Sequence, residues 1–115
     1  IAPFRSMVQH VYHHKIPFNK IYLIFGTRTQ ADLLYADEMK ALEQPMPGFR
    51  YIPTLSRESW QGHTGYVHPI YEELCRERPE AFFMLCGWRK MIDEANTRIL
   101  AMGYNKKDVE SELYG

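Results

Sequence analysis

An apolar run at residues 81–86, Ala-Phe-Phe-Met-Leu-Cys, constrains the fold of this chain more than any other feature. It ends at Gly87, and a helical pattern begins directly afterwards at Trp88. A short continuous apolar run bounded in this way is typical of a strand buried in a parallel sheet. Open α/β sheets bind ligands at the carboxyl ends of such strands. Cys86 and Gly87 stand at that end, so the sequence predicts a mononucleotide-type binding domain.

Two further apolar runs end in small or cationic residues. The run 20–26 leads into Gly26, Thr27 and Arg28, and the run 49–55 leads into Ser56 and Arg57. Small residues let a ligand approach the backbone closely, and a guanidinium next to a hydroxyl suits a phosphate monoester. We therefore expect three strand ends to contribute to one ligand crevice.

Helical and strand patterns alternate along the rest of the chain. Helices are predicted from Pro3 through the first apolar stripe, from Thr29 and Asp32 to about residue 44, over 69–78 and over 88–102 before Gly103. In the second helix, Leu33, Leu34 and Leu42 are expected to face the sheet. Strands are predicted at 20–26, 49–55, 81–86 and 110–114, and Pro53 favours an edge position for the second. This alternation predicts an α/β fold with a doubly wound parallel sheet and helices on both faces.

Composition limits the classes of function. The chain has 115 residues, which fits one domain, and its 14 basic side chains balance 14 acidic ones. That balance gives no general attraction to nucleic acid, and no apolar segment is long enough to span a membrane. Cys75 and Cys86 lack metal-site or disulfide spacing, which favours reduced thiols and a cytoplasmic location. His10, His13 and His14 have helical spacing but no supporting ligands, so no metal is expected.

Several segments resemble the nucleotide-binding half of the ferredoxin-NADP reductase superfamily of flavoproteins. They are IAPFRSM at 1–7, IYLIFGTRTQADLLYADE at 21–38, LSRES at 55–59, GYV at 65–67, FMLCGWRKMIDEA at 83–95 and the terminal ELYG. The resemblance implies that residues 1–115 are a partial NAD(P)-binding domain. In that family a first strand, a glycine-rich turn and a flavin-binding barrel precede the segment, and all three are absent from this chain.

The resemblance also implies site residues. Cofactor contacts are expected from Ile1, Ala2 and Pro3 after the turn, Gly26, Thr27 and Arg28 on the pyrophosphate and adenosine side, Ser56 and Arg57 at the 2′-phosphate of NADP, Tyr66 at adenine, and Gly87. Cys86 is expected where nicotinamide meets the flavin, and Tyr114 is expected to stack on that flavin. Each has a simpler alternative: Arg57 forms a surface ion pair with Glu58, Arg28 is a surface loop arginine, and Cys86 is an inert core thiol.

Two functions from different classes stay open. The first is an oxidoreductase module that binds NADPH and passes hydride to FAD, held mainly by the missing domain, for delivery of electrons to ferredoxin, flavodoxin or an iron-sulfur partner. The second is a nucleotide-binding module without catalysis. An NADH-preferring reductase component is a third alternative, because Thr64 and Gly65 precede Tyr66 where many NADP-dependent relatives carry a lysine. The chain alone is expected to be inactive.

Overall fold

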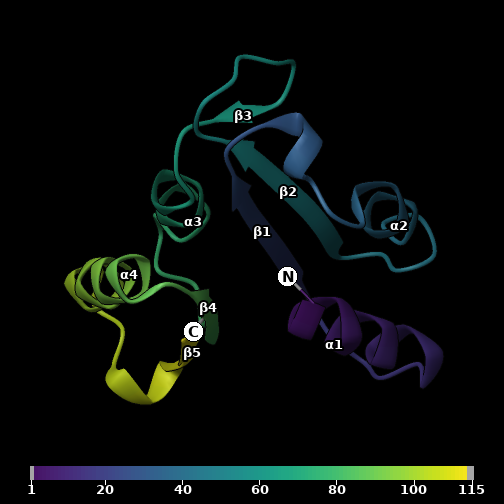
Figure 1. The fold of residues 1–115 in the computed structure, drawn as a ribbon. Coiled ribbons are helices and arrows are strands. Elements are labelled where there is room, and N and C mark those ends of the chain that lie inside the picture. Colours follow the sequence, from purple (N-terminus) through teal and green to yellow (C-terminus); the bar gives the residue numbers. More distant parts are fainter. Residues whose placement is uncertain (1, 114–115) are drawn as a thin grey trace. The chain divides into compact units, whose positions relative to one another are not determined.

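A computed structural model describes residues 2–113, although not the side chain of Ala2. The chain divides into two compact units, Ile1–Val67 and His68–Gly115. The first unit contains α1 (Ala2–His13), β1 (Ile21–Thr27), a 3₁₀ turn (Gln30–Asp32), α2 (Ala36–Ala41), β2 (Phe49–Leu55) and β3 (His63–Thr64). The second contains α3 (His68–Leu74), β4 (Phe83–Gly87), α4 (Arg89–Ala101), a 3₁₀ turn (Lys106–Asp108) and β5 (Val109–Leu113) (Figure 1).

The first unit is a parallel sheet in the order β1-β2-β3. β1 and β2 pair over their full length, from Ile21 opposite Phe49 to Thr27 opposite Leu55. α1 and α2 lie next to these two strands (Figure 1) and bury their apolar residues against one face of them. The buried cluster consists of Val8, Leu23, Met39, Met46, Phe49 and Tyr51. The core therefore supports β1 and β2, and their carboxyl ends, Thr27 and Leu55, lie side by side.

The second unit is built on a parallel pair of strands, β4 and β5. The ring of Phe83 on β4 makes edge contacts with Tyr71 of α3 and Tyr104, at centroid distances of 6.5 and 4.9 Å. α4 buries Ile92, Ala95 and Ile99, which recur at helical spacing. Gly103 has a φ of 104°, and as predicted it ends α4 in the left-handed conformation that favours glycine. The helices thus cover the Phe83 face of the strand pair.

The prediction of one helix from residue 29 to 44 is wrong. The structure has a 3₁₀ turn, then an extended stretch, and then a six-residue helix, α2. Tyr35 adopts a left-handed φ of 59° immediately before α2, and the guanidinium of Arg5 lies 4.4 Å from the centre of its ring. Leu34, expected to face the sheet, is 54% exposed. A contact with α1 therefore overrides the local helical pattern.

Arg5 also fixes the start of α2 through Glu38. Arg5 Nε donates to Glu38 Oε2 at 2.7 Å and Arg5 Nη2 donates to Glu38 Oε1 at 3.0 Å. Gln9 donates a further hydrogen bond to the same carboxylate. The hydrogen bond from Arg5 holds the pKa of Glu38 below its usual value, although partial burial opposes this. Two turns of α1 are thereby tied to the first turn of α2.

Two other expectations need correction. β2 is not an edge strand, because it lies between β1 and β3. However, β3 pairs only with Thr54 and Leu55, so Pro53, which has no N–H to donate, has a partner strand on one side only. α3 ends at Leu74 instead of residue 78, and Arg78 has a left-handed φ of 51°. Within residues 2–113 the parallel strands fall into two groups, β1-β2-β3 and β4-β5. No helix in this range has the length and apolar character required to cross a bilayer.

Candidate functional site

The ladder between β1 and β2 continues past the ends of both strands. The backbone N–H of Ser56 donates to the carbonyl of Thr27 at 2.9 Å, and that of Arg57 donates to the carbonyl of Arg28 at 3.0 Å. Ser56 Oγ makes a longer contact of 3.4 Å with the same Thr27 oxygen. The backbones of Arg28 and Arg57 therefore lie side by side at the carboxyl edge of the sheet, where parallel sheets bind ligands.

The two guanidinium groups have different surroundings. Arg28 Nε lies 3.9 Å from Asp32 Oδ2, and the Arg28 side chain is 67% exposed. Within residues 2–113 no carboxylate lies within 4.0 Å of the Arg57 side chain, so the alternative of an Arg57–Glu58 ion pair is not observed. Glu58 Oε2 instead accepts a hydrogen bond of 3.2 Å from the backbone N–H of Gln30. Two exposed guanidinium groups at adjacent strand ends suit a phosphate dianion.

Within residues 2–113, Tyr66 is the most exposed of the large hydrophobic residues, at 73%. It follows Gly65, whose carbonyl accepts a hydrogen bond of 2.9 Å from the buried hydroxyl of Thr54. Gly65 has a φ of 99°, a conformation that favours glycine. The backbone before Tyr66 is thus anchored to β2, while its ring is accessible for stacking on a planar ligand.

Gly26 has a packing role that sequence reasoning missed. A Cβ added at this position would lie 2.7 Å from Val67 Cγ1 and 3.6 Å from Thr54 Cγ2. The chain therefore needs a glycine here to seat Val67 against β1. Close approach of a nucleotide to Gly26 stays a prediction.

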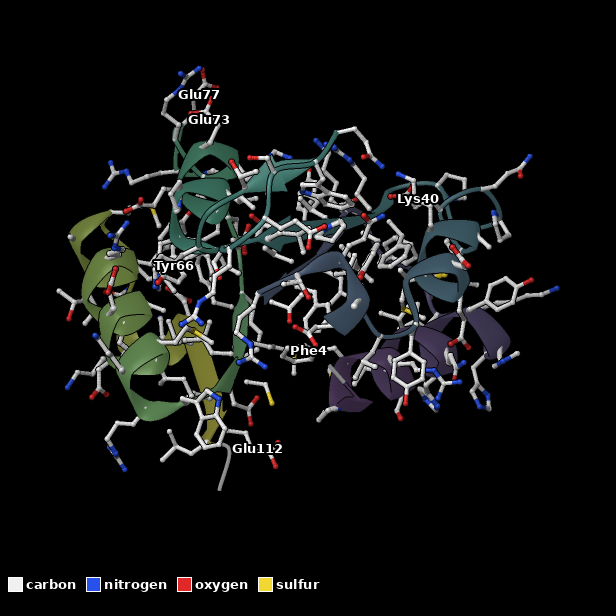
Figure 2. All side chains as sticks on the ribbon, turned by 45° about the horizontal axis from the view of Figure 1, so that its top comes forward. Phe4, Lys40, Tyr66, Glu73, Glu77 and Glu112 are labelled. Atoms are coloured by element: carbon white, nitrogen blue, oxygen red, sulfur yellow. The ribbon has the colours of Figure 1, made fainter. Side chains whose placement is uncertain are left out.

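The end of β4 places a thiol opposite a carboxylate. Cys86 on β4 is half-buried, and its partner in the parallel register is Glu112 on β5; Figure 2 marks Glu112. Gly87 is buried, and a Cβ there would collide with Met91 Cε, so the methionine of α4 occupies the adjacent space. By contrast, burial raises the pKa of the Cys75 thiol. Cys75 fits an inert core residue, whereas Cys86 lies near the carboxyl end of β4, and its role at nicotinamide stays a prediction.

Glu112 was not identified from the sequence. Its signal is indirect, because it depends on the register between β4 and β5 and not on any local motif. The expected strand at 110–114 matches β5, but a period of two only indicates that Glu110 and Glu112 share a face. The pairing with Phe83–Gly87 is needed to place that face beside Met84 and Cys86.

Other predicted site residues are less constrained. Pro3 lies in the first turn of α1, as expected, and Ala2 precedes it. Ile1 and Tyr114 lie outside the described residues. His10 and His14 have ring centroids 4.3 Å apart, but no group of three potential metal ligands occurs within residues 2–113. Two surface pockets of about 330 and 470 Å³ are lined by none of the predicted site residues.

Comparison with known proteins assigns the fold and the family. The family model described as the oxidoreductase NAD-binding domain matches residues 1–97. Ferredoxin-NADP reductase B of Sorangium cellulosum is 33% identical over 99% of this chain and 50% of its own length. NADH-cytochrome b5 reductase 1 of Lodderomyces elongisporus is 25% identical over 98% of this chain and 39% of its own length. The chain thus spans half or less of these relatives.

A solved structure confirms the predicted fold class. The cytochrome P450 reductase GcoB of Amycolatopsis superimposes with a TM-score of 0.81 at 20% sequence identity. The match covers 93% of this chain and 32% of that one. The α/β architecture with parallel strands therefore has the same fold as the matched part of that reductase.

Proposed function

We propose, from the premise that this chain belongs to the oxidoreductase NAD-binding domain family, that it is the NAD(P)H-binding module of a flavin-dependent reductase. The observation that carries the proposal is the pairing of Arg28 and Arg57 at the carboxyl edge of β1 and β2. Two cationic side chains on adjacent backbone positions at this edge would give a nucleotide phosphate complementary charge.

The first unit would hold the adenosine end of the nucleotide. Arg57 and Ser56 supply a guanidinium and a hydroxyl for a 2′-phosphate, and the exposed ring of Tyr66 supplies a stacking surface for adenine. Arg28 and Thr27 would contact the pyrophosphate. These groups fit the nucleotide because each offers a donor or an aromatic plane and none adds an uncompensated negative charge.

The second unit would hold the nicotinamide end. NADPH, when bound, supplies a hydride for the flavin of the complete reductase, which passes the electrons to a one-electron acceptor. Cys86 and Glu112 lie opposite each other in the register of β4 and β5. The carboxylate of Glu112 would accept a hydrogen bond from the nicotinamide amide, and the half-buried thiol of Cys86 would position the ring. Their role is alignment, since the cofactors perform the redox chemistry.

The complete protein would contain a further domain. The chain matches only 50% of one reductase relative and 39% of another. Within residues 2–113, β1 has a strand partner on one side only, and so has β4. We propose that an upstream segment provides a first strand with a glycine-rich turn and a flavin-binding barrel, and that ferredoxin, flavodoxin or an iron-sulfur protein accepts the electrons.

One experiment tests this function directly. The complete polypeptide that contains this sequence is purified, its visible absorbance is recorded, and oxidation of NADPH and of NADH is followed with ferricyanide as acceptor. We expect flavin bands and turnover with at least one nucleotide. A polypeptide with no flavin and no turnover would instead support a non-catalytic nucleotide-binding module.

Use of NADH is the second candidate, and one contact favours it. Asp32 Oδ2 lies 3.9 Å from Arg28 Nε and accepts a hydrogen bond from Thr29 Oγ1 at 3.1 Å. This carboxylate partly neutralises Arg28, and its negative charge beside the end of β1 would repel a further phosphate at this edge. The ratio of kcat/KM for NADPH and NADH in the same assay decides between the two nucleotides.

A further inference from the structure

Glu58 has an unusual place in the site described above. It follows Arg57 directly, in a position where a carboxylate would ordinarily pair with that arginine or repel a phosphate. Its Oε2 atom instead accepts the backbone N–H of Gln30, in the 3₁₀ turn that follows β1. The carboxylate is thus engaged by a segment 28 residues away in the sequence.

This contact closes a ladder between the two turns. From the strand ends outward, Ser56 N–H bonds to Thr27, Arg57 N–H bonds to Arg28, and Gln30 N–H bonds to Glu58. The first two bonds run from the β2 side to the β1 side, whereas the third runs in the opposite direction. Residues 27–30 and 56–58 are therefore joined at three successive points, and Glu58 provides the outermost one.

The 3₁₀ turn itself is organised from within. Thr29 Oγ1 donates to Asp32 Oδ2 at 3.1 Å, and the Asp32 N–H donates to the Thr29 carbonyl at 3.0 Å. Gln30 lies between these two residues, so the bonds between Thr29 and Asp32 hold its backbone N–H in place. A carboxylate that binds this N–H restrains the turn after β2 relative to the turn after β1, and so restrains both arginine backbones.

We propose that Glu58 is a positioning residue for the nucleotide phosphate. Its carboxylate accepts a hydrogen bond from Gln30 and so restrains the turn that carries Arg57 relative to the turn that carries Arg28. The inference rests on the proposed function and deepens it. Restraint of the turn that carries Arg57 lowers the cost of ordering this arginine when a 2′-phosphate binds. A ligand without that phosphate gains little from it, so Glu58 contributes to discrimination between NADP(H) and NAD(H).

Two substitutions separate this role from simple electrostatics. Glu58→Ala and Glu58→Gln remove the same negative charge, but the glutamine keeps an amide oxygen that can accept the Gln30 N–H. If Glu58 acts only through its charge, the two variants bind phosphate equally. If it acts through the hydrogen bond to Gln30, the glutamine variant binds phosphate more tightly than the alanine variant. Glu77→Ala is the matched control, because Glu77 is an exposed glutamate far along the chain from both turns.

The assay is calorimetric titration of the complete polypeptide with 2′,5′-ADP and with 5′-AMP. We expect Glu58→Ala to bind 2′,5′-ADP about fivefold more weakly than Glu58→Gln, in the range of one modest hydrogen bond. Binding of 5′-AMP should differ by less than about twofold. Hydrogen exchange at the Gln30 amide gives a second readout: it should be faster in Glu58→Ala than in the wild type and largely restored in Glu58→Gln.

The outcomes distinguish the inference from the proposed function. Wild-type binding of 2′,5′-ADP with equal affinities for Glu58→Ala and Glu58→Gln would overturn the inference alone. Equal losses for both ligands in Glu58→Ala would also overturn it, because the effect would then not concern the 2′-phosphate. A wild-type protein that binds neither ligand would refute the proposed function and, with it, the inference.

Discussion

Replacement of Gly26 by alanine tests whether this glycine serves packing or nucleotide approach. The added Cβ would lie 2.7 Å from Val67 Cγ1, about 1 Å closer than the usual separation of two non-bonded carbons. Val67 is β-branched and half-buried, so it cannot rotate away freely. We therefore expect Gly26→Ala to lower the free energy of unfolding of the first unit by about 1–3 kcal/mol, as for other overpacked sites.

A double-mutant cycle with Val67→Ala isolates the cause. Val67→Ala removes the clashing methyl groups, so adding Gly26→Ala to that background should cost less than about 0.5 kcal/mol. Hydrogen exchange of the β1 and β2 amides in the complete polypeptide reports the stability of this unit even if other parts unfold separately. An undiminished cost of Gly26→Ala in the Val67→Ala background would refute the packing argument. If the double variant regains stability but binds 2′,5′-ADP poorly, Gly26 also serves the nucleotide.

Three further substitutions test the site and its surroundings. Arg57→Ala should weaken 2′,5′-ADP binding by roughly 10- to 100-fold in calorimetry, because charge-assisted hydrogen bonds are lost; Arg76→Ala is the control, and equal effects would contradict the assignment. Cys86→Ser should lower kcat for NADPH oxidation about tenfold with little change in KM, since ring alignment is disturbed; an unchanged kcat would contradict this role. Burial lowers the pKa of His68 below its usual 6.5, although Glu94 opposes the shift, so the unfolded state binds the proton more readily. The stabilising contribution is complete above pH 6.5 and is lost as pH falls below it. His68→Gln should flatten this decline in urea unfolding, and an identical pH profile would argue against it.

Periodicity in the sequence was sufficient for the main elements. The apolar runs before Gly26, Ser56 and Gly87 became β1, β2 and β4, because a buried parallel strand requires apolar residues on both faces. Gly103 ended α4 where predicted, since a left-handed C′ residue has a strong local preference. The arginines after β1 and β2 could be expected to meet, because parallel strands end at one edge.

Features that depend on distant contacts could not be predicted. The break before α2 follows from Arg5, which contacts both Tyr35 and Glu38 across more than one element. Nothing near residues 33–35 signals this interruption. The pairing of Glu112 with Cys86 depends on strand register in the same way. The sequence left an ion pair between Arg57 and Glu58 open as an alternative, because the bond of Glu58 to Gln30 exists only when both turns are folded.

The parallel pairing of β1 with β2 also determines how the first unit can fold. Ile21 pairs with Phe49, so the two strands cannot form first as a hairpin with a tight turn. The connection contains only a 3₁₀ turn and the six-residue α2, and so short a helix is unstable in isolation. Strand pairing and burial of Met39 and Phe49 must therefore occur together. Folding rates of this unit should respond to substitutions at those two core positions and hardly at all to changes of helix propensity on the exposed side of α2.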